Sequence, residues 1–101
     1  MAWVDVAAAD AIEEEDVIEV SVGDRVLAIY RTRDGYFATD GICSHQHAHL
    51  ADGLVIGNII ECPKHQGRFD VRDGAPKGPP ASAPIRTHPV EVLDGRVRVG
   101  L

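Results

Sequence analysis

Short runs of β-branched residues, separated by turns of Gly and Asp, constrain the fold of this chain more than any other feature. The run from Val17 to Val22 alternates apolar and polar side chains, which is the two-residue period of a strand with one buried face. Asp-Gly between two such runs is a strong hairpin signal, and it occurs at 34–35, 52–53 and 94–95. Many short strands with regular turns predict an all-β protein, an antiparallel sandwich or small barrel.

The expected strands lie between these turns. They span residues 17–22, 25–31, 36–39, 54–56, 59–61, 69–71, 89–93 and 96–99. Only Asp10 to Asp16 favours a helical turn. We interpret the Pro- and Gly-rich segment 74–84 as an ordered loop, because the hairpin beyond it is too small to fold alone. Residues 1–101 are therefore expected to form a single domain.

The composition leaves this domain short of bulky core residues. Aromatic residues make up 5% of the chain, so packing is expected to be helped by a disulfide or a metal. The formal charge of −6 makes nucleic-acid binding improbable. Acidic residues gather between Asp10 and Glu19, either as a docking surface for a basic partner or as a solvated face.

The sequence shows neither a signal peptide nor an apolar run of the roughly 20 residues that span a bilayer. We therefore expect a cytoplasmic protein without a membrane segment. In that compartment thiols stay reduced, and two cysteines more often bind a metal than each other.

The two cysteines belong to a constellation of possible metal ligands. Cys43 and His45 are followed, after sixteen residues, by Cys62 and His65. Two thiolates and two imidazoles suit tetrahedral zinc or an asymmetric iron–sulfur cluster. In a Rieske [2Fe–2S] cluster two Cys hold one iron and two His the other, and one Cys and one His from each loop supply that set directly. The spacing favours the cluster, with zinc and unligated core residues as alternatives.

The flanks of these boxes resemble the Rieske-type ferredoxins of bacterial aromatic-ring-hydroxylating dioxygenase systems, over nearly the whole chain. The resemblance is carried by residues 36–40 before Cys43, by 50–53, by 61–70 around Cys62 and by 84–90. It implies the Rieske fold, with a cluster-binding part of two loops at about residues 40–84. Pro80 matches the proline loop that shields the cluster in this family.

The resemblance also implies roles for the ligands and partners. Cys43 and Cys62 would ligate the inner iron of one [2Fe–2S] cluster, and His45 and His65 the outer, redox-active iron. The protein would be a monomeric electron carrier, not an enzyme, passing single electrons from an NAD(P)H-dependent flavoprotein reductase to a terminal oxygenase. The alternatives are a metal-stabilised binding module and the Rieske portion of an oxygenase subunit.

Four further positions predict a low potential. Relatives that oxidise quinols carry two extra Cys where this chain has Ala48 and Lys64, and Ser and Tyr hydroxyls where it has Gly67 and Phe69. Each missing hydroxyl removes a donor that would stabilise the reduced cluster.

The remaining histidines are expected to play lesser parts. His47 and His49 are interpreted as solvent-facing loop residues or part of a docking rim, and His88 as a packed or surface side chain. Tyr30 and Trp3 are expected in the core or on a sheet face, and Lys64 is expected to point outward.

Overall fold

The computed structural model describes residues 1–43, 48–64, 66–78 and 83–101. Within these ranges it consists of short strands and two single 3-10 turns. The strands are β1 (Trp3–Ala8), β2 (Asp16–Val22), β3 (Arg25–Thr32), β4 (Gly35–Asp40), β5 (Leu54–Ile56), β6 (Ile59–Glu61), β7 (Arg68–Asp70), β8 (Thr87–His88), β9 (Val90–Leu93) and β10 (Arg96–Gly100). The turns are η1 (Ala9–Ala11) and η2 (Leu50–Asp52).

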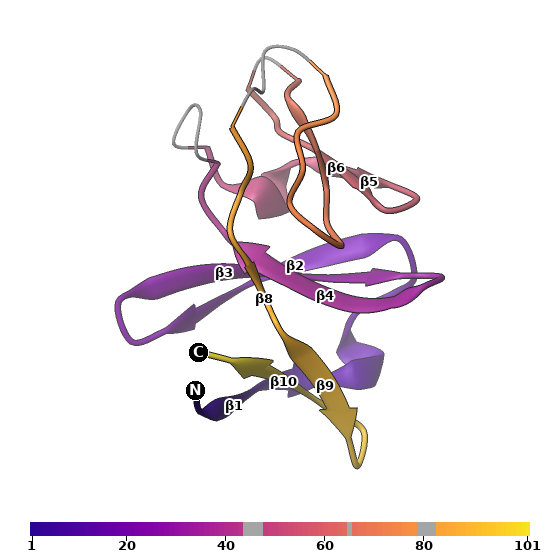
Figure 1. Ribbon diagram of the computed structural model, residues 1–101. Coiled ribbons are helices and arrows are strands. Elements are labelled where there is room, and N and C mark those ends of the chain that lie inside the picture. Colours follow the sequence, from indigo (N-terminus) through magenta and orange to yellow (C-terminus); the bar gives the residue numbers. More distant parts are fainter. Residues whose placement is uncertain (44–47, 65, 79–82) are drawn as a thin grey trace.

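These strands form three antiparallel sheets stacked along the molecule (Figure 1). The central sheet has the order β2-β3-β4-β8, the terminal sheet β1-β10-β9, and the small sheet β5-β6-β7. The all-β antiparallel architecture expected from the turn spacing is thereby confirmed. No helix among the described residues is long and apolar enough to cross a membrane.

Strand β3 is buried on both faces, because it lies in the middle of this stack. Leu27 and Ile29 point into one core, whereas Ala28 and Tyr30 point into the other, as the alternation of a strand requires. This explains its uninterrupted apolar run, which is typical of a strand covered on both sides.

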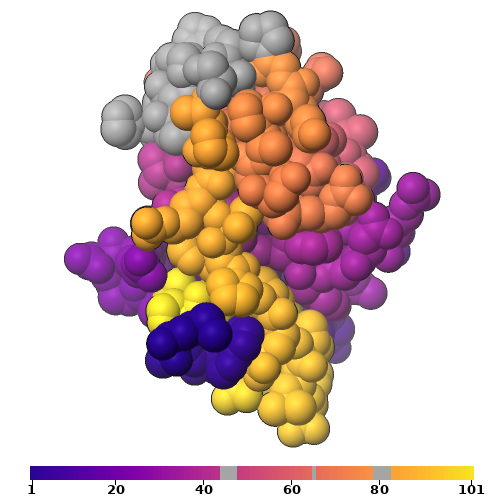
Figure 2. All heavy atoms as spheres, in the orientation of Figure 1, coloured from indigo at the N-terminus to yellow at the C-terminus, as the bar shows by residue number. Residues whose placement is uncertain are grey.

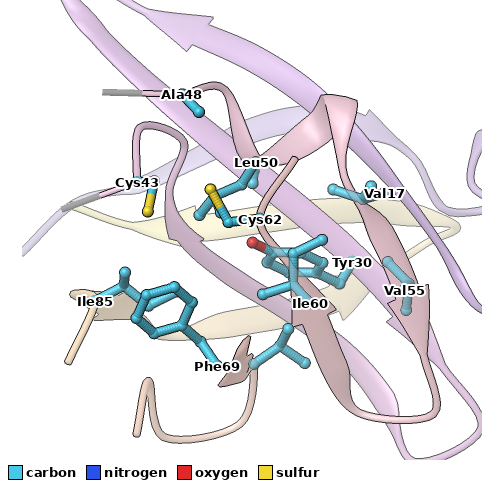
Figure 3. Close-up of a cluster of buried hydrophobic side chains, with 12 residues drawn as sticks. Val17, Tyr30, Cys43, Ala48, Leu50, Val55, Ile60, Cys62, Phe69 and Ile85 are labelled. Atoms are coloured by element: carbon cyan, nitrogen blue, oxygen red, sulfur yellow. The ribbon is translucent and has the colours of Figure 1, made fainter. Parts of the chain in front are cut away.

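The two cores are separate clusters of buried side chains. The terminal core lies between the central and terminal sheets and contains Ile12, Leu27, Ile29, Ala38, Val97 and Val99. The cysteine core lies between the central and small sheets (Figure 3). It contains Val17, Ala28, Tyr30, Cys43, Ala48, Leu50, Val55, Ile60, Cys62, Phe69, Val71 and Ile85.

The chain ends and the return segment join these layers. Strand β1 pairs with β10, and the N–H groups of Ala2 and Leu101 each donate to the other residue's carbonyl over 2.9 Å. The segment that contains β8 and continues into β9 runs over the surface of the molecule, from beside the small sheet to the terminal sheet (Figure 2). It pairs with β4 on the way, so that the polypeptide crosses back beside the strand that leads to Cys43.

Most of the expected strands are confirmed, some with ends shifted by a residue, and one expected element is wrong. The helical turn predicted from Asp10 to Asp16 lies earlier, at η1, and Asp16 already begins β2. Between them Glu15 adopts a left-handed backbone conformation with φ 61°, which ends any helix there. Strands β1 and β8 were not predicted, because their pairing partners lie far away in the sequence.

Candidate metal centre

The two predicted cysteines make matching backbone hydrogen bonds. The N–H of Cys43 donates to the carbonyl of Ala48 over 2.7 Å, and the N–H of Cys62 donates to that of Gly67, also over 2.7 Å. In each case the cysteine N–H is bonded to the carbonyl of the residue five positions later. Cys62 directly follows β6, whereas Cys43 lies three residues beyond β4 and follows Ile42, which forms a single bridge with His49.

Both thiols are buried and unoxidised. Cys43 is 2% exposed and Cys62 is 1% exposed, and neither forms a disulfide. Their side chains lie side by side in the cysteine core, near Leu50 and Ile85 (Figure 3). Apolar neighbours exclude water from the two sulfur atoms. Exclusion of water is one of the factors that set the redox potential of a bound metal group.

The environment of Cys62 disfavours its thiolate when the thiol is alone. Burial raises the pKa of the Cys62 thiol and the adjacent Cys43 thiol adds to that rise, whereas the backbone N–H of Lys64 opposes it. A coordinated cation reverses this balance, because a metal deprotonates the thiols that bind it. Two adjacent, buried, free thiols therefore fit the cysteine half of an iron–sulfur site.

The other half of the predicted ligand set lies outside the described residues. These two ligands are His45 and His65. His47 and Pro80, which are not in the ligand set, also lie outside the described residues. Within the described ranges, no three His, Cys, Asp or Glu side chains gather into a metal site.

The two histidines that are described have other partners. Nδ1 of His49 bonds to the carboxylate of Glu19 on β2, and the side chain is half exposed. Nε2 of His88 lies 2.8 Å from Oδ1 of Asp40, with the His88 side chain only 7% exposed. His49 is exposed, as expected for a solvent-facing residue or part of a docking rim. Of the two settings expected for His88, packed or at the surface, the structure shows the packed one.

The predictions for Lys64, Tyr30 and Trp3 are also confirmed. Lys64 is exposed, Tyr30 is fully buried, and Trp3 lies partly exposed on β1. Phe69 is fully buried as well. Phe69 contributes only carbon to the cysteine core.

Part of the acidic segment has a role that sequence reasoning missed. Glu19 bonds to His49, just after the first loop, and Oε2 of Glu15 accepts the N–H of Gly57 over 2.7 Å, between β5 and β6. The two carboxylates thus tie His49 and the turn between β5 and β6 to the N-terminal end and body of β2, in the central sheet. The partners are 30 and 42 residues apart, and no local pattern signals such a pairing.

Comparison with known proteins agrees with this centre. Residues 2–89 match the Rieske [2Fe-2S] domain. The ferredoxin component of the naphthalene 1,2-dioxygenase/salicylate 5-hydroxylase systems of Ralstonia sp is 42% identical, with 94% of this chain and 91% of that protein covered. The anthranilate 1,2-dioxygenase ferredoxin subunit of Burkholderia cepacia is 38% identical, with 98% and 92% covered.

A solved structure shows the same fold. The Sphingomonas yanoikuyae B1 ferredoxin superimposes with a TM-score of 0.93 at 35% identity, and 99% of each chain is covered. The chain belongs to the Rieske [2Fe-2S] family, and within it to the ferredoxins of aromatic dioxygenase systems. As a ferredoxin it is an electron carrier with one [2Fe-2S] cluster and not the catalyst of its system. This resolves the choice between zinc and cluster in favour of the cluster.

Proposed function

We propose that Cys43, His45, Cys62 and His65 are the four cluster ligands. The observation that carries this proposal is the pair of buried free thiols whose residues make matching backbone hydrogen bonds. His45 and His65 follow these thiols by two and three residues, so each loop carries one thiolate and one imidazole. The bound cluster supplies a one-electron redox couple. The chain's own residues hold the thiols and exclude water through the cysteine core.

Histidine variants test this ligand set against matched controls. His45→Asn and His65→Asn should each lose the visible absorption of the cluster and its two irons and two sulfides per chain. His47→Asn and His49→Asn, close by in the sequence, should keep the visible absorption and the full content of iron and sulfide. Loss of the cluster in the His49 variant with retention in the His45 variant would contradict the assignment.

We propose further that the cluster has a low potential, near the bottom of the range of roughly −150 to +300 mV. Gly67 has no side chain, and Phe69 is fully buried without a hydroxyl, so neither position supplies a side-chain hydrogen-bond donor to the cysteine core. Fewer donors leave the more negative reduced state less stabilised. A redox titration of the purified protein should show this, and a clearly positive midpoint would rule the proposal out.

The partners that we propose are an NAD(P)H-dependent flavoprotein reductase and a terminal oxygenase. Support comes from a chain in a complex of reduced oxygenase and oxidised ferredoxin of carbazole 1,9a-dioxygenase. It matches with a TM-score of 0.91 at 39% identity, covering 96% of this chain and 91% of that one. The formal charge of −6 suits docking against basic partner surfaces. We place the protein in the cytoplasm as a monomer.

Stopped-flow mixing tests the direction of electron flow. Reduced reductase should reduce the ferredoxin, and the reduced ferredoxin should then be oxidised by the oxygenase, both at least as fast as overall turnover. Added salt should slow both steps, since association between opposite charges is screened. Slow transfer with salt-independent rates would argue against these partners.

A further inference from the structure

The two free thiols of the cysteine core are direct neighbours. The Cys43 side chain lies within hydrogen-bonding reach of the Cys62 thiol, and Figure 3 shows the two sulfur atoms side by side. They belong to segments that follow different strands, β4 and β6. The first requirement for a disulfide, two thiols that meet in the folded protein, is therefore fulfilled.

No third thiol can compete for a reaction between these two. Cys43 and Cys62 are the only cysteines among the 101 residues of the chain. The other buried members of the cysteine core carry no charge that would stabilise an oxidised sulfur. Among the described residues, an oxidised sulfur in this core therefore has the second thiol as its reactive neighbour.

We propose that Cys43 and Cys62 form an intramolecular disulfide when hydrogen peroxide has destroyed the cluster, and that this bond keeps the site in a repairable state. The inference rests on both cysteines being cluster ligands, as proposed above. While the cluster is bound, both sulfur atoms are coordinated and are not free to react. Loss of the cluster releases them next to each other.

The oxidation consumes one molecule of hydrogen peroxide for each disulfide. One thiol attacks a peroxide oxygen, the O–O bond breaks, and a sulfenic acid and a water form. The second thiol then attacks the sulfenic sulfur, the S–O bond breaks, and the disulfide and a second water form. Each sulfur gives one electron to the peroxide, and the two thiol protons end in the two waters.

The disulfide protects the site in two ways. A sulfenic acid without a neighbouring thiol proceeds to sulfinic and sulfonic acids, which are irreversible, whereas a reductant restores both thiols of a disulfide. The bond also links the segment after β6 to the segment after β4, which constrains the cysteine core after the cluster is lost. The site is then closed to iron until a reductant reopens it.

Peptide mass spectrometry tests for this bond. Trypsin leaves both cysteines in one peptide, residues 34–64, because no Lys or Arg lies between Arg33 and Lys64. After hydrogen peroxide has bleached the visible absorption of the holoprotein, this peptide should be lighter by the two thiol hydrogens and should resist alkylation. Dithiothreitol should make both cysteines alkylable, and the protein should then rebuild its cluster from iron and sulfide. Without dithiothreitol, rebuilding should fail.

Two controls connect this result to the arrangement of the thiols. In Cys62→Ala, which has no second thiol, peroxide should carry Cys43 to sulfinic and sulfonic acids that dithiothreitol does not reverse. The wild-type protein, freed of its cluster and dissolved in guanidinium, should give more of these acids and less disulfide than in buffer. The reason is that the unfolded chain no longer holds the thiols together.

Several outcomes would overturn the proposal. Free, alkylable thiols in the bleached protein are one, and sulfinic acids or a disulfide-linked dimer in place of the intramolecular bond are others. An equal share of disulfide in guanidinium and in buffer would show that the fold does not bring the thiols together. If peroxide leaves the cluster intact, the same oxidation after removal of the cluster by acid and chelator decides. Failure of the ligand assignment is distinguishable, because Cys43→Ser would then keep its iron and sulfide before any peroxide is added.

Discussion

Gly53 illustrates how a single residue controls the approach of two strands near the second loop. A Cβ atom at this position would lie 2.1 Å from the carbonyl oxygen of Glu61, the residue before Cys62. Backbone atoms cannot yield as a flexible side chain does. Only glycine therefore lets the start of β5 lie against the end of β6.

Gly53→Ala should accordingly destabilise the protein. Forcing extra volume into a packed site costs about 1–3 kcal/mol, and each kcal/mol lowers the melting midpoint by roughly 4–8 °C in a domain of this size. Thermal unfolding followed by circular dichroism measures the change. Gly78→Ala is the control, because its Cβ would meet no atom of the described residues within 4 Å. Equal melting of the two variants would contradict the close approach.

The His49–Glu19 contact is a residue-scale feature that depends on pH. Its hydrogen bond with Glu19, and then the charge of that carboxylate, raise the pKa of His49 above its ordinary value of 6.5. A raised folded-state pKa means that the contact stabilises the protein fully below pH 6.5. That stabilisation is lost as the pH rises through the raised pKa.

An NMR titration of the His49 ring should therefore show a pKa above 6.5 in the wild type. Glu19→Gln should return it towards 6.5, whereas Glu13→Gln, with the same change of net charge, should not. The pH dependence of the melting midpoint above pH 6.5 should shrink in Glu19→Gln alone. Identical titration curves in the three proteins would show that the contact is absent in solution.

At the scale of elements, the turn between β5 and β6 is tied to the central sheet by two carboxylates. Glu15 accepts the N–H of Gly57, and Nδ2 of Asn58 donates to Oδ2 of Asp34 over 2.6 Å. The amide oxygen Oδ1 of Asn58 is buried and has no hydrogen-bond partner among the residues that the structure describes. The turn is therefore positioned by contacts from the residue before β2 and from the β3–β4 turn, and not only by its own hairpin.

Glu15→Ala should loosen this turn locally. A hydrogen bond contributes about 1 kcal/mol, so amide exchange at Gly57 should speed up about fivefold. The Val71 N–H, which donates to the Asn58 carbonyl over 2.9 Å, should show a smaller change. Glu14→Ala, one residue earlier, is the control and should leave Gly57 unaffected. Unchanged exchange at Gly57 in Glu15→Ala would mean that the tie does not hold the turn.

The elements also show which signals can be read from the sequence. The strand of residues 54–56 was predicted with its observed bounds, because the turns that flank it are local signals. The strand Trp3–Ala8 was missed, because its partner β10 lies at the other end of the chain. A helical turn was expected across Glu15, but this residue has a left-handed backbone. Its contact with Gly57, which lies far away in the sequence, outweighs the local helical preference.

For the molecule as a whole, the separation into two cores is the main feature. The cysteine core contains both thiols, whereas the terminal core contains none. A metal group bound to the thiols would therefore stabilise one core directly and the other only through the shared central sheet. In many proteins, regions that pack around different cores unfold locally and independently of each other.

Removal of the cluster by acid and chelator should expose this difference. Hydrogen exchange followed by mass spectrometry should show strong loss of protection in β5, β6 and β7. Strands β1 and β10, which cover the terminal core, should keep most of theirs. A uniform loss across all strands would show that the two cores unfold as one unit.

The sequence alone determined the strand and turn pattern, the two cysteines and the family resemblance. These signals are local: a two-residue period, a turn dipeptide and the spacing within a ligand box need no distant partner. The tertiary structure decided that β3 is covered on both faces, and that the two thiols lie side by side in one core. It also decided that Glu15 and Glu19 serve as internal ties. The physical reason is that a strand's own period sets which side chains alternate, whereas long-range packing sets what each face meets.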